Sequence, residues 1–125
     1  MSHTYSLGRE QRIRGYDNFR KVIEQGKKHV GTCSILYAIP TRCSTRVGIV
    51  AGKRIGNAVE RNRAKRLLRE VLRLNRMRIA DGFEIVLIAR AACIRNTLWD
   101  NALDIIKLFE RAGCLCASRE KQIKS

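Results

Sequence analysis

The run Phe83-Glu84-Ile85-Val86-Leu87-Ile88-Ala89 is apolar at six of its seven positions. A strand with one face in water alternates apolar and polar side chains, whereas a strand covered on both faces is apolar almost throughout. The run therefore predicts the central strand of a sheet that is packed on both sides. Asp81-Gly82, just before it, marks a turn.

Two more strands are expected upstream of this run. Residues 32–39 alternate in character, and Pro40 ends the pattern because proline has no N–H to donate to a ladder. One face of that strand would carry Cys33, Ile35, Tyr37 and Ile39. Residues 46–52 predict a second strand, antiparallel to the first, and residues 27–31 leave room for an additional early strand.

Three helices are expected around these strands. Asp17 can cap a short helix that runs to about Gln25, and a long helix covers residues 57–78. A last helix, about 98–112, ends at Gly113. The predicted order α-β-β-(β)-α-β-α gives a two-layer α/β (α+β) sandwich, in which helices pack on a small mixed sheet.

The length of 125 residues predicts one domain over 1–125, with a core of about 9–116 and frayed ends at 1–8 and 118–125. No apolar run approaches the roughly 18 residues of a membrane span, so no membrane association is expected. The first residues also lack the basic-then-apolar build of a signal peptide. We therefore expect a soluble protein that stays in the compartment where it is made.

Positive charge is concentrated in one part of the chain. The formal net charge is +15, from 26 Lys and Arg against 11 Asp and Glu. Residues 1–80 hold 19 of those cations and 5 of the acids, so nearly the whole excess lies there. Charge that served only solubility would not need to be concentrated in one part of the chain. Binding to an acidic partner such as nucleic acid is the simplest reason for this concentration.

The helix expected at 57–78 carries much of this charge on one face. Its apolar side would be formed by Ala64, Leu67, Leu68, Val71, Leu72 and Leu74. At about 100° per residue, the opposite side collects Asn62, Lys65, Arg66, Arg69, Arg73 and Arg76. We refer to these last six residues as the basic stripe, and Arg61 and Arg63 flank it.

A solvated helix face is the simplest alternative explanation of the basic stripe. Solvated faces usually mix opposite charges at i,i+4, but here Arg66, Arg69 and Arg73 stack like charges. Each such pair costs roughly a few tenths of a kcal/mol unless an anion neutralises it. Arginine also has a planar fork that suits phosphate and stacks on bases, so the pattern favours nucleic-acid binding.

The residues just before this helix form a second candidate feature. Gly48, Gly52 and Gly56 recur at four-residue intervals, and Lys53 and Arg54 stand between the last two. Free N–H groups at a helix N-terminus can also bind phosphate. Glycines alone more often mean a turn or bulge, but before the basic stripe they suggest close approach of the backbone to RNA or DNA.

Two aromatic side chains allow two interpretations. Phe19 and Tyr37 could both belong to the core, which suits Phe19 better than Tyr37. If both line a groove instead, they are stacking platforms for single-stranded bases, with Arg20 and Lys21 near the nucleic-acid backbone.

Residue patterns for catalysis or metal binding are missing from the sequence. The five cysteines are odd in number and irregular in spacing, which argues against a disulfide framework and against zinc. No nucleophile elbow, His–carboxylate pair or H-E-x-x-H motif occurs, and the acids are too scattered for a two-metal nuclease site. We expect no catalytic residue and no metal ligand, so any catalysis that involves this chain takes its reactive groups from elsewhere.

One long stretch resembles the signature of a known family. Residues 53–70 read Lys-Arg-Ile-Gly-Asn-Ala-Val-Glu-Arg-Asn-Arg-Ala-Lys-Arg-Leu-Leu-Arg-Glu. They resemble the bacterial ribonuclease P protein component, whose signature has an Arg-Asn-Arg core followed by Lys-Arg and a further Arg one turn on. The similarity continues in collinear order over most of residues 9–112, and this extended run is far more specific than an Arg-Asn-Arg triplet alone.

The resemblance implies a fold and a function. Members of the family fold as an α/β sandwich with a left-handed β-α-β crossover, similar to domain 2 of ribosomal protein S5, and bind one large catalytic RNA. The holoenzyme is an endoribonuclease that cuts the 5′ leader from precursor tRNA, and the RNA, which binds most of the required Mg²⁺, does the chemistry. The implied partners are that RNA, with one protein per RNA, and the precursor tRNA leader, and the implied location is the cytoplasm.

The resemblance also implies residue roles by position. The RNA-contacting helix of the family is matched by Arg61, Asn62, Arg63, Lys65, Arg66 and Arg69, and the basic rim of its leader cleft by Lys53 and Arg54. With Arg73, which the basic stripe adds, these are the expected RNA-binding residues. The cleft for the single-stranded leader would be lined by Phe19, Arg20, Ile35, Tyr37 and Arg90. Two departures fall in this cleft, because Ile23 stands where many relatives carry a second aromatic and Ala91 stands where a second basic residue is common.

Two other functions share parts of the pattern. A structural RNA-binding protein of ribosomal type would have the same charge and fold without leader recognition. A DNA-binding protein could place the 57–78 helix in a major groove, but the sequence offers no helix-turn-helix partner for it.

Overall fold

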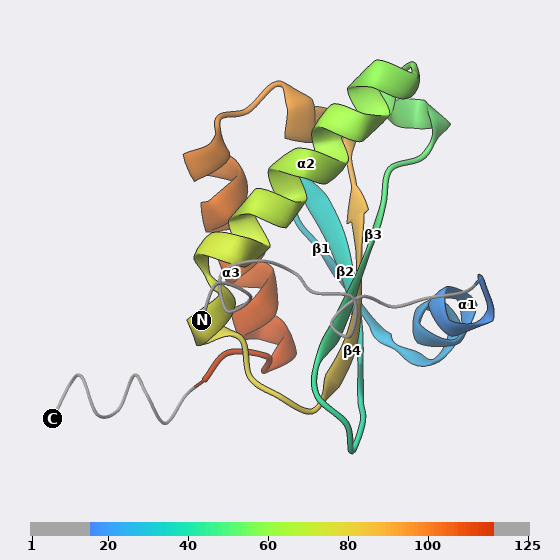
Figure 1. Cartoon of the computed structure of the whole chain (residues 1–125), viewed down its shortest axis with the longest axis vertical. Coiled ribbons are helices and arrows are strands. Elements are labelled where there is room, and N and C mark those ends of the chain that lie inside the picture. The colour runs from blue at the N-terminus through green and yellow to red at the C-terminus, as the bar shows by residue number, and fades with distance from the viewer. Residues whose placement is uncertain (1–15, 117–125) are drawn as a thin grey trace, which may run out of the picture.

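The structure, a computed structural model, describes residues 16–116 and contains every element that the sequence predicts (Figure 1). The helices are α1 Tyr16–Gln25, α2 Ala58–Leu74 and α3 Leu98–Ala112, and the strands are β1 Lys27–Val30, β2 Ser34–Pro40, β3 Arg46–Val50 and β4 Phe83–Ala89. Asp17 lies inside α1 and is therefore not its N-cap. The frayed ends expected at 1–8 and 118–125 fall outside the described residues. Between residues 16 and 116, no helix is long and apolar enough to cross a membrane.

The four strands form one mixed sheet in the order β1-β2-β4-β3. β4 is its central strand, antiparallel to β2 and parallel to β3. β3 runs opposite to β2, as expected, but β4 lies between them and β3 ends at Val50 rather than near Gly52. Because adjacent parallel strands need a crossover connection, α2 links β3 to β4 across one face of the sheet.

Helices cover both faces of the sheet, as the apolar run of β4 predicts. Figure 1 shows α2 and α3 on one side and α1 on the other. Ile85, Leu87 and Ala89 of β4 point into the main core with α2 and α3, whereas Val86 packs with Val22 of α1. Cys33 was expected to share a strand face with Tyr37 and Ile39, but it precedes β2 and lies in the main core, whereas those two residues pack with α1.

α2 is shorter than the sequence predicts. Asn57 caps its start, because the Asn57 side chain accepts the Glu60 N–H at 2.9 Å and Glu60 Oε1 accepts the Asn57 N–H at 3.0 Å. The helix ends at Leu74, where Asn75 Nδ2 donates to the Val71 carbonyl at 2.8 Å. Two expectations are therefore wrong: Arg76 lies in a 3-10 turn beyond the helix, and Leu74 is 51% exposed rather than buried.

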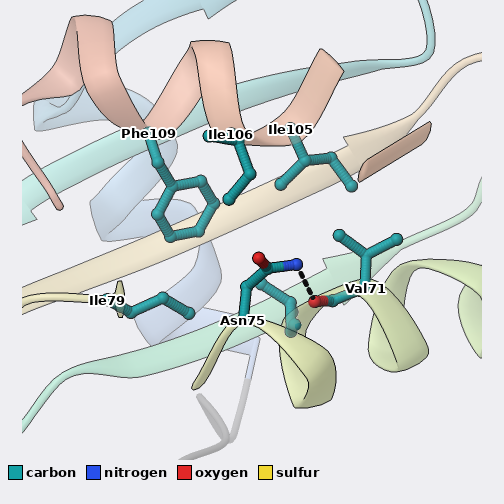
Figure 2. A pocket seen from close by; sticks show the side chains of 7 residues that line it. Val71, Asn75, Ile79, Ile105, Ile106 and Phe109 are labelled. Carbon is teal, nitrogen blue, oxygen red and sulfur yellow. Dashed lines mark hydrogen bonds between the residues drawn. The ribbon is translucent and has the colours of Figure 1, made fainter. Parts of the chain in front are cut away.

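The seam between α2 and α3 holds α2 against the rest of the molecule. Figure 2 shows Ile105, Ile106 and Phe109 pointing from α3 toward Val71 of α2 and toward Asn75, which caps the C-terminal end of α2. The gap that these side chains leave is too small to admit water. This packing fixes the orientation of α2, so that its polar side faces away from the core.

Candidate nucleic-acid interface

The outer side of α2 forms an open polar face. Val59, Asn62, Arg66 and Arg69, spaced by three and four residues, border a hollow of about 420 Å³. The three polar members are exposed, and they bring half of the basic stripe together as expected. Val59 is 72% exposed and was not anticipated as part of this face, although its helical spacing from Asn62 is visible in the sequence.

Arg73 differs from its neighbours because it has an acid partner. Its Nε and Nη2 donate to Glu70 Oε1 and Oε2 at 2.8 Å and 2.5 Å. This hydrogen bond lowers the pKa of the Glu70 carboxyl and raises the pKa of the Arg73 guanidinium. Among the described residues, Arg66 and Arg69 at the centre of the stripe therefore have no acid partner, whereas Arg73 near the C-terminal end of α2 is paired with Glu70.

The cations that flank the stripe are presented in different ways. Lys53 and Arg54 are exposed on a 3-10 turn, which buried Ile55 anchors in the main core. Arg61 is half-buried and its Nη1 donates to the Gly56 carbonyl at 3.3 Å, so it also braces the start of α2. Arg63, which also flanks the stripe, is exposed, whereas Lys65, a member of the stripe, is half-buried.

Two glycines, Gly52 and Gly56, stand on either side of Lys53 and Arg54, and the structure explains why a glycine is needed at only one of these positions. Gly56 has a φ of 144°, which favours glycine, and a Cβ at this position would strike the Glu60 side chain. The capping box of α2 is thus sufficient by itself to explain a glycine at this position. Gly52 is exposed, and a Cβ there would meet no atom of residues 16–116 within 4 Å, so the described part of the chain leaves the backbone here open to a ligand.

Among residues 16–116, only α1 covers the face of the sheet on which it lies, and it covers only part of that face. Strand register places Val30, Ile35, Ile88 and Val50 in one row across all four strands. We call this the apolar row; Val30 is 48% exposed and the other three are half-buried. α1 packs over the other end of this face, against Ile39 and Val86. The uncovered part, with the apolar row, is called the open sheet face below.

Phe19 and Tyr37 lie where α1 meets the open sheet face. Both are half-buried against the cluster of Val22, Ile39 and Val86. Each ring therefore stabilises the fold and still leaves part of its surface exposed. The two interpretations of the sequence, a core residue and a stacking platform, are thus compatible with each other. Arg20 is exposed on α1, with its Nε 3.4 Å from Glu24 Oε1.

Arg90 lies at the far end of the open sheet face from α1. It follows β4 directly, its N–H donates to the Cys33 carbonyl at 2.9 Å, and its Nη1 donates to the Gly31 carbonyl at 2.6 Å. Because β3 and β4 are parallel, the residues that follow them lie at the same end of the sheet. Arg90, the turn with Lys53 and Arg54, and the N-terminus of α2 are therefore neighbours at that end.

The structure offers no site for a metal ion within residues 16–116. No group of three His, Cys, Asp or Glu side chains in that range is arranged to hold one. The two acids on α2 are already engaged, Glu60 by the Asn57 N–H and Glu70 by Arg73. All five cysteines are free, and burial raises the pKa of Cys93 and of Cys114 to about 11.

Comparisons with known proteins agree with one another. A family model described as Ribonuclease P matches residues 7–113. The ribonuclease P protein component of Symbiobacterium thermophilum is 39% identical over 99 residues, covering 78% of this chain and 86% of that protein. The corresponding protein of Bacillus cereus strain B4264 is 33% identical over 109 residues, covering 86% and 95%. The solved RNase P protein from Thermotoga maritima superposes with a TM-score of 0.72 at 28% identity, over 80% of this chain and 96% of that one.

Proposed function

This chain belongs to the bacterial ribonuclease P protein family, and we propose that two different surfaces of the chain bind the two RNAs of that enzyme, its RNA subunit and its substrate. As a component of the RNase P endoribonuclease, the protein assists removal of the 5′ leader from precursor tRNA, and RNase P RNA is its partner. In our proposal the polar face of α2 binds this RNA. The open sheet face binds the single-stranded leader.

The polar face of α2 supports the first assignment. Arg66 and Arg69 are exposed and have no acid partner in the part of the chain that the structure describes. Their guanidinium groups can donate paired hydrogen bonds to phosphate oxygens, which would relieve the repulsion between them. Lys53, Arg54 and Arg63 extend the exposed positive charge toward the N-terminal end of the helix.

The observation that carries the leader assignment is the apolar row, which residues 16–116 leave partly exposed beside two half-buried rings. Unpaired bases can stack on aromatic side chains and lie on an apolar surface, while the phosphates meet cations at its rim. Phe19 and Tyr37 supply the rings, and Arg20 and Arg90 supply cations at opposite ends. A ribosomal-type RNA-binding protein would not need this surface.

The acidic residues of α2 do not fit a Mg²⁺ site. Mg²⁺ prefers several oxygen ligands in near-octahedral geometry, and the acids of α2 are already engaged by Asn57 and Arg73. We therefore propose that the Mg²⁺ of the holoenzyme is bound mainly by RNA, and that this chain contributes no catalytic group. The proposal further includes one protein per RNA and action in the cytoplasm, where precursor tRNA is made.

Reconstitution tests the proposal directly. The protein, its RNase P RNA, and both together are incubated with precursor tRNA at low Mg²⁺, and cleavage products are resolved by gel electrophoresis. We expect efficient cleavage only with both components. Cleavage by the protein alone that is abolished by changing one carboxylate would contradict the proposal that this chain contributes no catalytic group. Equal affinity of the holoenzyme for precursor and mature tRNA would contradict leader recognition.

A further inference from the structure

We infer that Asp104 of α3 is a positioning residue for leader binding: through the turn between β1 and β2 it fixes the guanidinium of Arg90 at the end of the open sheet face. The inference rests on the proposed leader function of that face. Asp104 acts through other residues and is not itself a contact to the leader.

Asp104 holds the β1–β2 turn by its carboxylate. Its Oδ1 accepts the N–H of Thr32 at 2.9 Å, and its Oδ2 accepts the N–H of Cys33 at 3.0 Å and the hydroxyl of Ser34 at 3.5 Å. One side chain on α3 thus satisfies two consecutive backbone donors about 70 residues earlier in the chain. Hydrogen bonds to an ionised acceptor are stronger than neutral ones, so this turn is firmly held.

Gly31 allows this approach. A Cβ at position 31 would lie 2.6 Å and 2.7 Å from the two carboxylate oxygens of Asp104. The reason for glycine is therefore steric, because a Cβ here would displace the Asp104 carboxylate from its position against the turn. The N–H of Gly31 also donates to the Ser34 carbonyl at 2.8 Å and closes the turn.

The same turn determines where Arg90 points. The Gly31 carbonyl accepts from Arg90 Nη1 at 2.6 Å, and the Val30 carbonyl accepts from Arg111 Nη1 at 3.3 Å. Two side chains of α3, Asp104 and Arg111, therefore fix the backbone to which Arg90 is bound. If the turn moves, the guanidinium loses its fixed acceptor.

The held guanidinium remains able to bind a ligand. Alternation along β4 places Ile88 on the open sheet face, and the extended backbone of Arg90 (φ −102°, ψ 163°) continues that alternation. A guanidinium has five N–H donors, so the bond to Gly31 leaves others for a leader phosphate. Because the side chain is already ordered, binding does not have to restrict it further, which favours affinity.

A double-mutant cycle in the reconstituted holoenzyme tests the inference. Arg90→Ala, Asp104→Asn and the double variant are compared for affinity toward precursor tRNA with a long leader and toward mature tRNA. Arg90→Ala should weaken precursor binding about tenfold, as for one charge-assisted contact, and leave mature tRNA binding unchanged. Asp104→Asn should give a smaller loss of the same kind, and the double variant should be no worse than Arg90→Ala alone.

Two further variants separate positioning from general damage. Glu110→Gln removes one acid from an exposed position on the same helix and should leave both affinities unchanged. Gly31→Ala should weaken binding of precursor tRNA, and not of mature tRNA, to the same extent as Asp104→Asn. It can therefore replace Asp104→Asn in the test if that variant unfolds. Thermal unfolding followed by circular dichroism establishes that each variant is folded.

The outcomes distinguish this inference from the proposed function. If Arg90→Ala weakens precursor binding while Asp104→Asn and Gly31→Ala do not, or if the losses simply add, the positioning role is overturned and leader binding stands. If neither Arg90→Ala nor Tyr37→Ala discriminates between precursor and mature tRNA, the leader assignment itself fails.

Discussion

Tyr37 on β2 lies directly opposite Val86 on β4, and Val86 packs against Val22 of α1. Tyr37 therefore stands at the border between the part of the sheet that α1 covers and the apolar row. A ring in this position can stabilise the fold with one part of its surface and offer another to a base.

Replacing this ring tests leader binding. Tyr37→Ala should weaken precursor tRNA binding by the holoenzyme by up to about 1–3 kcal/mol, the contribution of stacking one base, with mature tRNA nearly unaffected. Equilibrium binding of both tRNAs to a stably folded variant measures this. Trp99→Ala is the matched control, because Trp99 is 73% exposed on α3, across the sheet from Tyr37. An equal loss for both tRNAs would contradict the assignment.

The central arginines of the basic stripe should dominate RNA affinity. Arg66→Ala and Arg69→Ala should each weaken binding to RNase P RNA by about 1–3 kcal/mol, because each removes a charge-assisted contact. Lys107→Ala removes the same charge from an exposed position on α3 and should have little effect. Titration of labelled RNA measures all three variants. Similar losses at all three positions would mean that net charge, and not the α2 face, drives binding.

Glu70 should limit the number of phosphate contacts by holding Arg73. Since the hydrogen bond from Arg73 lowers the pKa of Glu70, the pair persists at neutral pH and is lost only as pH falls through that lowered pKa. Glu70→Gln should free Arg73 and steepen the dependence of log K on log[salt] by about one unit. RNA binding measured over a salt series checks this, and an unchanged slope would show that Glu70 does not limit the phosphate contacts of Arg73.

The capping box should contribute measurably to stability. Asn57→Ala removes the acceptor for the Glu60 N–H and should lower the free energy of unfolding by about 0.5–2 kcal/mol. Asn62→Ala changes the same residue type at an exposed position inside α2 and should stay within about 0.5 kcal/mol of the parent protein. Urea unfolding compares the two, and equal losses would argue against the cap.

The cysteines should differ sharply in reactivity. Cys43 is exposed, whereas burial raises the pKa of Cys93 and of Cys114 to about 11 and keeps both thiols protonated at neutral pH. Brief alkylation of the native protein followed by mass spectrometry should therefore label Cys43 and spare the other two. Their labelling should increase only on unfolding or as pH approaches 11. Rapid labelling of Cys93 at neutral pH would contradict the buried environment.

Much of the fold and of the candidate site can be predicted from the sequence because the signals are local. An apolar run identifies β4 as a strand covered on both faces, and helical spacing places Asn62, Arg66 and Arg69 on one face of α2. Gly113 ends α3 with a φ of 74°, as its position in the sequence predicts. Such features depend on residues within a few positions of one another, so periodicity and capping chemistry reveal them.

Other features were decided only when the chain folded. Alternation tells which side chains share a strand face but not which strands are neighbours, so the place of β4 between β2 and β3 depends on the packing of α2 across the sheet. Glu70 lies close to Arg73 in sequence, yet which arginine it holds depends on side-chain geometry. Asp104 meets Gly31 across about 70 residues, and no local pattern encodes that contact. Contacts of this kind form only because burial of the two apolar clusters brings distant segments together.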